Sequence, residues 1–187
     1  MHDEFLLEPT TTAQWKRLLQ QAEDKANCSL DEELESYLIF TLIRFTQNPD
    51  LACRALAPDF LHGINKLGQA REQQLRDVGD QCLLLSGLFP QRAEKRLVTI
   101  QYYVGMGQAA YDHLGQLMRQ ALANLYKQLA ASFVQLMDVL QNIRDQNNLM
   151  PLQALELWGS TGSQNAYRIL SQHTNATPVV PNKRIQH

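Results

Sequence analysis

The run from Leu114 to Gln146 constrains the fold more than any other part of the sequence. Its apolar residues return every three or four positions, which places them on one face of an α-helix. As one continuous helix the run would extend on the order of 50 Å, because each residue adds about 1.5 Å. Such a length indicates either a central helix surrounded by the others or one of the two helices of a coiled-coil-like dimer.

Helical spacing extends over most of the chain, and the two-residue alternation of a β-strand is nearly absent. Ser29 with Glu32 fits a capping box at a helix start, and Thr99 is placed to cap a later helix. We therefore predict an all-α fold, a single bundle-like domain over residues 1–173 built around the long helix at 114–146. Residues 174–187 have no periodicity and are expected to form a flexible tail.

The composition is that of a folded protein with little net charge. Hydrophobic residues make up 44% of the 187 residues, so global disorder is not expected. The formal net charge of −2 argues against nucleic acid as a partner. Residues 1–89 hold 8 basic and 14 acidic side chains, whereas residues 90–187 hold 9 and 5. This asymmetry is either chance or a basis for contact between the halves, within one chain or between two.

Cysteine usage and the termini favour the cytoplasm. Cys28, Cys53 and Cys82 are far apart and lack the spacing of a zinc site, which is typical of free thiols in a reducing compartment. The first residues carry acids where a secretory signal needs basic residues. The longest apolar stretch, Tyr37 to Ile43, is too short to span a bilayer.

The segment Arg71–Tyr111 concentrates the residues that could bind or react. Asp77 and Asp80 are three positions apart, so they are close on a helix surface. Paired carboxylates can bind a hard cation or divide acid and base roles. They can also form salt bridges with Arg92 or Arg96 across the following turn, and we favour this structural pairing.

Charged residues flank this carboxylate pair on both sides. Glu72 and Arg76 are four residues apart on the same helix and are expected to lie close together. Arg92, Lys95 and Arg96 follow a Gly-Leu-Phe-Pro break and form a basic turn. That turn is either a solvated surface or a contact for phosphate or an acidic partner.

Glycines and tyrosines in the same segment suggest close packing or a pocket. Gly79 and Gly107 stand inside helices, where glycine costs roughly 1 kcal/mol relative to alanine. We favour close contact of two helices there, with a ligand pocket lined by Tyr103 and Tyr111 as the alternative. Tyr102 and Tyr103 point about 100° apart on a helix, so at most one is expected to face the core.

Near the end of the sequence, Gly159 to Ser163 precede a helix predicted at Gln164–His173. These small residues are expected to form a flexible link. The alternative is an anion-binding nest at the N-terminus of that helix.

The dense segment resembles a family of uncharacterised bacterial helical proteins, mainly from proteobacteria. The resemblance rests on a D-x-G-D, L-x-x-S-G-x-F-P, Y-Y, G and A-Y pattern, found here at Arg76–Pro90, Tyr102–Val104 and Gly107–Tyr111. It implies a bacterial helical domain and carries no activity.

The sequence contains no catalytic motif, so we expect a non-enzymatic regulatory or adaptor protein of the cytoplasm. Its partner is expected to be another protein or a second copy in a homodimer, with no membrane, nucleic acid, metal or cofactor involved. One alternative is a small-molecule sensor with a pocket between the Gly79 and Gly107 helices, lined by Tyr103, Tyr111 and Arg76. A second is a metal-assisted helical enzyme that uses Asp77, Asp80 and His113. The expected contact residues are Arg76, Asp77, Asp80, Arg92, Arg96, Tyr102, Tyr103, Gly107 and Tyr111.

Overall fold

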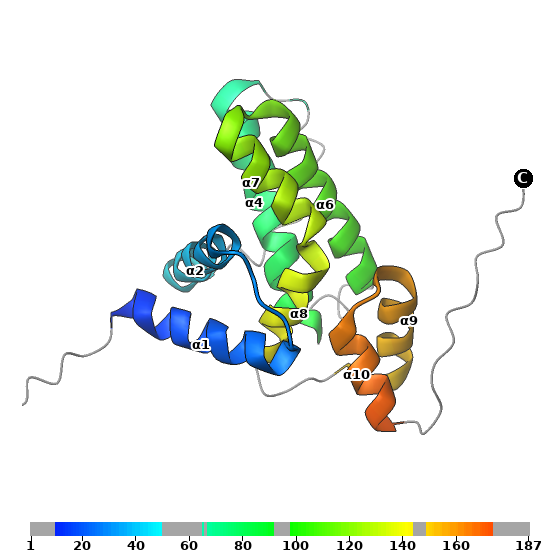
Figure 1. The fold of residues 1–187 in the computed structure, drawn as a ribbon. Helices are drawn as coiled ribbons and strands as arrows, with labels where there is room; N and C mark the ends of the chain where they lie inside the picture. Colours follow the sequence, from blue (N-terminus) through cyan, green and yellow to red (C-terminus); the bar gives the residue numbers. More distant parts are fainter. Residues whose placement is uncertain (1–9, 50–64, 66, 92–97, 144–148, 174–187) are drawn as a thin grey trace, which may run out of the picture.

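The computed structural model describes residues 10–49, 65, 67–91, 98–143 and 149–173. Within these ranges the chain forms eight α-helices and no β-strand, which confirms the all-α prediction (Figure 1). The helices are α1 (Thr11–Ala26), α2 (Glu32–Gln47), α4 (Gly68–Gly87), α6 (Ile100–Leu117), α7 (Gln120–Ala131), α8 (Phe133–Ile143), α9 (Pro151–Thr161) and α10 (Gln164–His173). In the described part of the chain, none of them is both long and apolar enough to cross a bilayer. The predicted tail at 174–187 lies outside the described residues.

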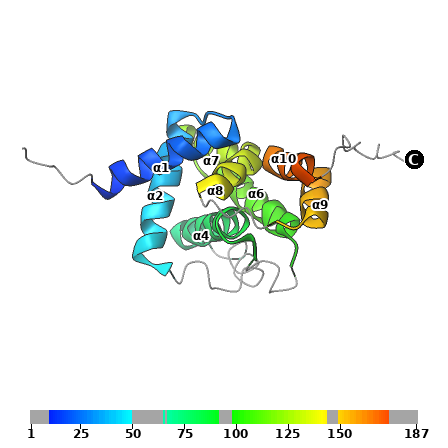
Figure 2. The same ribbon diagram turned by 90° about the horizontal axis from the view of Figure 1, so that it is seen from below.

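The helices are arranged around α8. Helices α4, α6 and α7 lie side by side as an elongated bundle, and α8 continues from the lower end of α7 (Figure 1). Helices α1 and α2 cover one side of this bundle, while α9 and α10 lie on the other. Seen from below, α8 is in the middle, in contact with α1, α4, α6 and α10 (Figure 2).

Helix α8 is buried on every face over residues 136–142, about two turns. Its apolar side chains at Phe133, Leu136, Met137, Val139 and Leu140 are fully buried. Its polar residues Asp138, Gln141 and Asn142 are buried as well. A helix enclosed on every face is the centre of a core, so this eleven-residue helix has the role predicted for the whole run at 114–146.

The prediction of one helix over 114–146 is wrong, because the run folds as the end of α6, then α7, then α8. The chain reverses direction over residues 118–120, where Gln120 adopts a left-handed φ of 50°. Close packing of the two arms requires Gly115, since a Cβ there would lie 3.3 Å from a backbone oxygen of α7. A second, one-residue break at Ser132 separates α7 from α8. The apolar spacing continues across both breaks because all three helices face the same core.

One of the two predicted helix caps is present. The hydroxyl oxygen of Thr99 accepts the backbone N–H of Tyr102 at 3.3 Å, as expected for the start of α6. The capping box predicted at Ser29 is not formed, since α2 begins only at residue 32. The backbone N–H of Leu30 instead donates to the Glu23 carboxylate at 2.7 Å, which ties the start of α2 to the end of α1.

Candidate functional site

The predicted carboxylate pair is held by an arginine from α2. Asp80 is only 2% exposed, and its Oδ2 accepts a hydrogen bond from Nη2 of Arg44 at 2.6 Å. The same Arg44 nitrogen lies 3.2 Å from Oδ1 of Asp77. The hydroxyls of Tyr37 and Tyr111 both donate to Oδ1 of Asp80, at 2.6 and 2.7 Å. One carboxylate therefore joins α2, α4 and α6.

Burial and charge determine the protonation of this cluster. Burial raises the pKa of Asp80 above its ordinary value, although Arg44, Tyr37 and Tyr111 each lower it. Burial also raises the pKa of both tyrosines well above the ordinary value, and the nearby Asp80 raises them further. Both phenols therefore keep their protons at neutral pH and remain donors to Asp80.

Three tyrosines pack around the Asp80 carboxylate. The rings of Tyr37, Tyr111 and Tyr126 have centroids 6.1 Å apart in each of the three pairs. Such separations suit edge and tilted contacts between aromatic rings. The cluster is therefore a packed aromatic interior in which the hydroxyls of Tyr37 and Tyr111 are used by Asp80.

At Gly79 and Gly107 the interior between α4 and α6 is filled, so the described side chains leave no space for a ligand beside these two glycines. A Cβ on Gly79 would lie 2.4 Å from the ring of Tyr111, and one on Gly107 would lie 2.4 Å from the ring of Phe133. These distances are far below van der Waals contact. Both glycines serve close packing, which was the favoured prediction.

The adjacent tyrosines divide between core and surface, as expected. Tyr103 is 2% exposed, whereas Tyr102 is 43% exposed on the outer side of α6. Arg92 and Arg96, the arginines predicted to pair with the carboxylates, lie outside the described residues.

The residues of the metal-assisted hypothesis do not form a metal site. No group of three or more His, Cys, Asp and Glu side chains within the described ranges could hold a metal ion. Asp80 already accepts three donors, and His113 does not join it and Asp77 in such a group.

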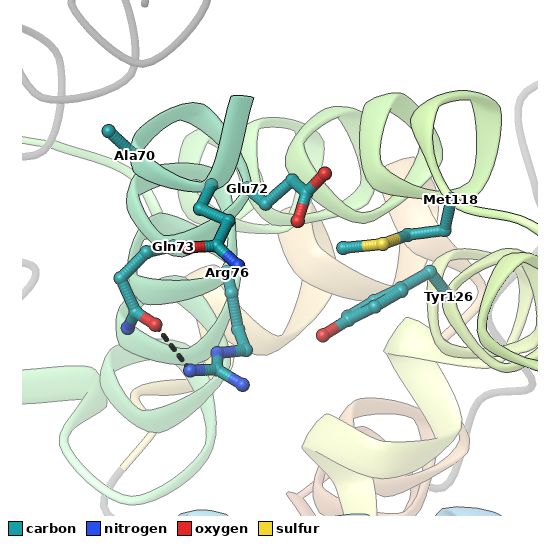
Figure 3. A pocket seen from close by; sticks show the side chains of 7 residues that line it. Ala70, Glu72, Gln73, Arg76, Met118 and Tyr126 are labelled. Carbon is teal, nitrogen blue, oxygen red and sulfur yellow. Dashed lines mark hydrogen bonds between the residues drawn. The ribbon is translucent and has the colours of Figure 1, made fainter. Parts of the chain in front are cut away.

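Arg76 lines a cleft between α4, the end of α6 and α7, beside Tyr126 of the Asp80 cluster (Figure 3). The cleft has a volume of about 480 Å³ and is lined by Gln69, Ala70, Glu72, Gln73, Arg76, Met118 and Tyr126. One guanidinium nitrogen of Arg76 donates to Oε1 of Gln73, and its buried Nε has no hydrogen-bond partner. Burial would lower the pKa of Arg76, but Tyr126, Tyr37 and the two aspartates raise it above its ordinary value. Arg76 therefore supplies a permanent positive charge to this cleft.

A second buried carboxylate caps α10. Asp138 of α8 is 5% exposed, and its Oδ1 accepts the hydroxyl of Ser163 at 2.6 Å. Its Oδ2 accepts the backbone N–H groups of Gln164 and Asn165 at 2.9 and 3.3 Å. Burial raises the pKa of Asp138, while these hydrogen bonds lower it. The anion at this helix N-terminus is thus a side chain of the same chain.

The predicted link at residues 159–163 is largely helical. Residues 159–161 belong to α9, and only Gly162, with a left-handed φ of 73°, interrupts the helix before Ser163. Ser163 is fully buried. The flexible link was therefore a wrong prediction. An anion does lie at the N-terminus of α10, but it is the Asp138 side chain, and of residues 159–163 only Ser163 donates to it, through its hydroxyl.

Helix α9 exposes apolar side chains on its outer face. Met150, Leu152 and Leu155 are 64%, 67% and 45% exposed, whereas Ala154 and Leu157 on the opposite face are buried. The described helices therefore leave one side of α9 uncovered.

Comparison of the chain with known protein families, with curated proteins and with solved structures finds no match. The resemblance to a proteobacterial helical family stays a prediction. The geometry of the described residues is thus the basis for any functional proposal.

Several residues that build these sites were not singled out from the sequence. Tyr37 and Arg44 of α2 are seven residues apart and therefore lie on one face, beside the apolar stripe. Two polar side chains on one face, next to the apolar stripe, were the sequence signal that this face of α2 could contact a buried polar group on another helix. Tyr126 and Asp138 stand within apolar helical runs, and local spacing carried no signal for either.

Proposed function

We propose that this protein acts without catalysis, by binding another protein through the outer face of α9. The supporting observation is the exposure of Leu152 and Leu155 on α9 and of Met150 directly before it. The described residues of the expected contact region, 77–91 and 98–111, are mostly buried, so the proposed surface is placed on α9 instead. Exposed groups of large apolar side chains mark interaction surfaces more often than single exposed residues do.

The shape of this face suits a helical partner. Leu152 and Leu155 are three residues apart and are neighbours on the helix surface. Gly159 follows four residues later, and a Cβ there would meet nothing within 4 Å. An exposed ridge of two leucines that ends in a glycine offers apolar contact and room for close approach. We therefore propose an amphipathic helix as the contacting element, from another cytoplasmic protein or from a second copy of this chain.

The two alternatives differ in their support. A metal-assisted enzyme has no candidate site among the described residues. A sensor is supported by the cleft at Arg76, which is one of the three residues expected to line its pocket, whereas Tyr103 and Tyr111 are not among the residues that line this cleft. Neither alternative accounts for the exposed face of α9.

Photo-crosslinking in the source cells tests the proposed interface. A photoreactive residue is placed at Glu156, which is exposed beside the ridge but is not part of it. We expect one discrete adduct, with a second copy or with another protein, and we expect Leu152→Glu combined with Leu155→Glu to abolish it. The same photoreactive residue at Gln116, exposed on α6, is the matched control and is expected to give no such adduct.

Light scattering after size-exclusion chromatography separates the two partners. A dimer that becomes a monomer in the doubly charged variant indicates a second copy, and an adduct with a monomeric protein indicates a different one. The proposal fails if position 156 gives no discrete adduct while the protein is monomeric, or if the adduct survives both glutamate substitutions.

A further inference from the structure

We propose that the cleft between α4, the end of α6 and α7 binds a free amino acid with an apolar side chain. Its carboxylate would meet Arg76, its ammonium group would meet Glu72, and its side chain would lie against Met118 and Tyr126 (Figure 3). This inference does not depend on the α9 interface.

The first support is that two opposite charges on one helix do not pair with each other. Glu72 and Arg76 are four residues apart, a spacing that normally brings the two charges together. Arg76 instead donates to Gln73, and Glu72 forms no hydrogen bond or ion pair with the described residues. Figure 3 shows the Glu72 carboxylate directed toward Met118, away from the Arg76 guanidinium. Both side chains line the same cleft, and their Cβ atoms are roughly 5–6 Å apart.

The second support is that Arg76 is held in position. Gln73, which accepts from Arg76, donates through Nε2 to Oδ1 of Asp77 at 2.9 Å. Asp77 lies 3.2 Å from Arg44, which is itself bonded to the buried Asp80. This chain of bonds fixes one edge of the guanidinium before any ligand arrives, which reduces the ordering that binding requires.

The third support is the apolar wall opposite α4. Tyr126 is 5% exposed and presents its ring edge and hydroxyl toward Arg76, while the partly buried Met118 lies over the ring (Figure 3). Methionine adapts to ligands of different shape because its side chain is unbranched and polarizable. The volume of about 480 Å³ lies within the roughly 300–1,000 Å³ of small-molecule sites.

The two charges select the class of ligand. A simple anion would use Arg76 and leave the negative charge of Glu72 close by, which weakens its binding. A simple cation would meet the opposite problem at Arg76. A molecule that carries both charged groups on one carbon atom, with an apolar remainder, uses every wall of the cleft.

Isothermal titration calorimetry on the full chain tests the proposal, with leucine, methionine and phenylalanine as probes. We expect at least one of them to bind saturably. For that probe, the amide that lacks the carboxylate and the N-acetyl form that lacks the ammonium group are each expected to bind about tenfold more weakly or worse. These analogues test both contacts without any change to the protein.

Substitutions locate the site. Arg76→Gln and Glu72→Gln are each expected to weaken binding about tenfold or more. Arg71→Gln is the matched control, because Arg71 is on the same helix but does not line the cleft, and its affinity is expected to stay within about twofold of the parent. Thermal melts by circular dichroism show whether each variant is folded.

Three results would overturn the proposal. The first is the absence of binding by all three amino acids up to about 10 mM, well above a millimolar dissociation constant. The second is equal binding of the N-acetyl form, which would indicate a simple anion site. The third is unchanged binding in folded Arg76→Gln and Glu72→Gln, which would place the site elsewhere.

Discussion

Asp80 and Asp138 are both buried aspartates, with 2% and 5% of their surface exposed, but they meet different donors. Asp80 faces the full positive charge of Arg44 and two phenol hydroxyls. The direct donors to Asp138 are one hydroxyl and two backbone N–H groups at the start of α10. The negative charge of a buried carboxylate can therefore be stabilised by a positively charged side chain or by the N–H groups at the N-terminus of a helix.

The two solutions hold different parts of the molecule. Asp80 holds long side chains from α2 and α6, and its loss leaves two hydroxyls without an acceptor in a packed interior, while the partly exposed Arg44 keeps its contact with Asp77. Asp138 fixes the backbone of α10, and its loss strands donors at a helix end, where local fraying gives them access to water. We therefore expect a substitution of Asp80 to lower the stability of the whole fold, and a substitution of Asp138 to lower the stability of α10.

The largest effect is expected for Asp80→Ala. Leaving a buried donor without its acceptor costs about 1–3 kcal/mol, and this substitution does so to the hydroxyls of Tyr37 and Tyr111, so a total cost of about 2–6 kcal/mol is expected. Urea denaturation of this variant is expected to show a loss of that size in the free energy of unfolding. Asp77→Ala is the control, since Asp77 also contacts Arg44 but its side chain is 22% exposed, and its loss is expected to cost about 1 kcal/mol or less. Equal losses in the two variants would contradict the distinction.

A smaller and more local effect is expected for Asp138→Ala. Hydrogen bonds to a charged group contribute about 1.5–3 kcal/mol, so the free energy of unfolding is expected to fall by that amount. Hydrogen exchange is expected to accelerate for the amides of α10 while those of α4 keep their protection. Asp112→Ala on the exposed side of α6 is the control and is expected to change neither. Uniform acceleration over all helices would mean that α10 does not open separately.

The smallest effect is expected for the pH dependence of Asp138. Its pKa is raised in the folded chain from an ordinary value of 3.8, so the folded state binds the extra proton between the two values. The stability linked to that proton is fully present below 3.8 and is lost as the pH rises through the folded pKa. The difference in unfolding free energy between the wild type and Asp138→Asn is therefore expected to shrink from acid to neutral pH. A difference that grows toward neutral pH would show that the helix end lowers this pKa more than burial raises it.

Much of the fold follows from local spacing. The period of three to four residues predicts the helices, Thr99 is the cap that the structure shows, and residues 164–173 form the helix predicted there. The breaks within 114–146 were missed for a physical reason. A left-handed Gln120 costs roughly 1–2 kcal/mol locally and is stabilised only by packing between α6 and α7, which the residues around the turn do not encode.

The candidate sites were less predictable because their partners are distant in sequence. The spacing of Asp77 and Asp80 indicated an arginine partner, but Arg44 lies 36 residues before Asp80. Asp138 is followed 25 residues later by Ser163, its partner at α10. Residue spacing within one helix identifies which side chains share a face. It contains no information on which other helix that face meets.

The contact of Gly79 with Tyr111 has a consequence for how this sequence can change in descent. The ring atoms that a Cβ at Gly79 would strike, at 2.4–2.9 Å, belong to the phenol whose hydroxyl binds Asp80. A larger residue on α4 would therefore displace the ring and break its bond to the carboxylate in one step. We expect these three positions to be inherited as a unit, so that related sequences keep the glycine, the tyrosine and the aspartate together or replace all three.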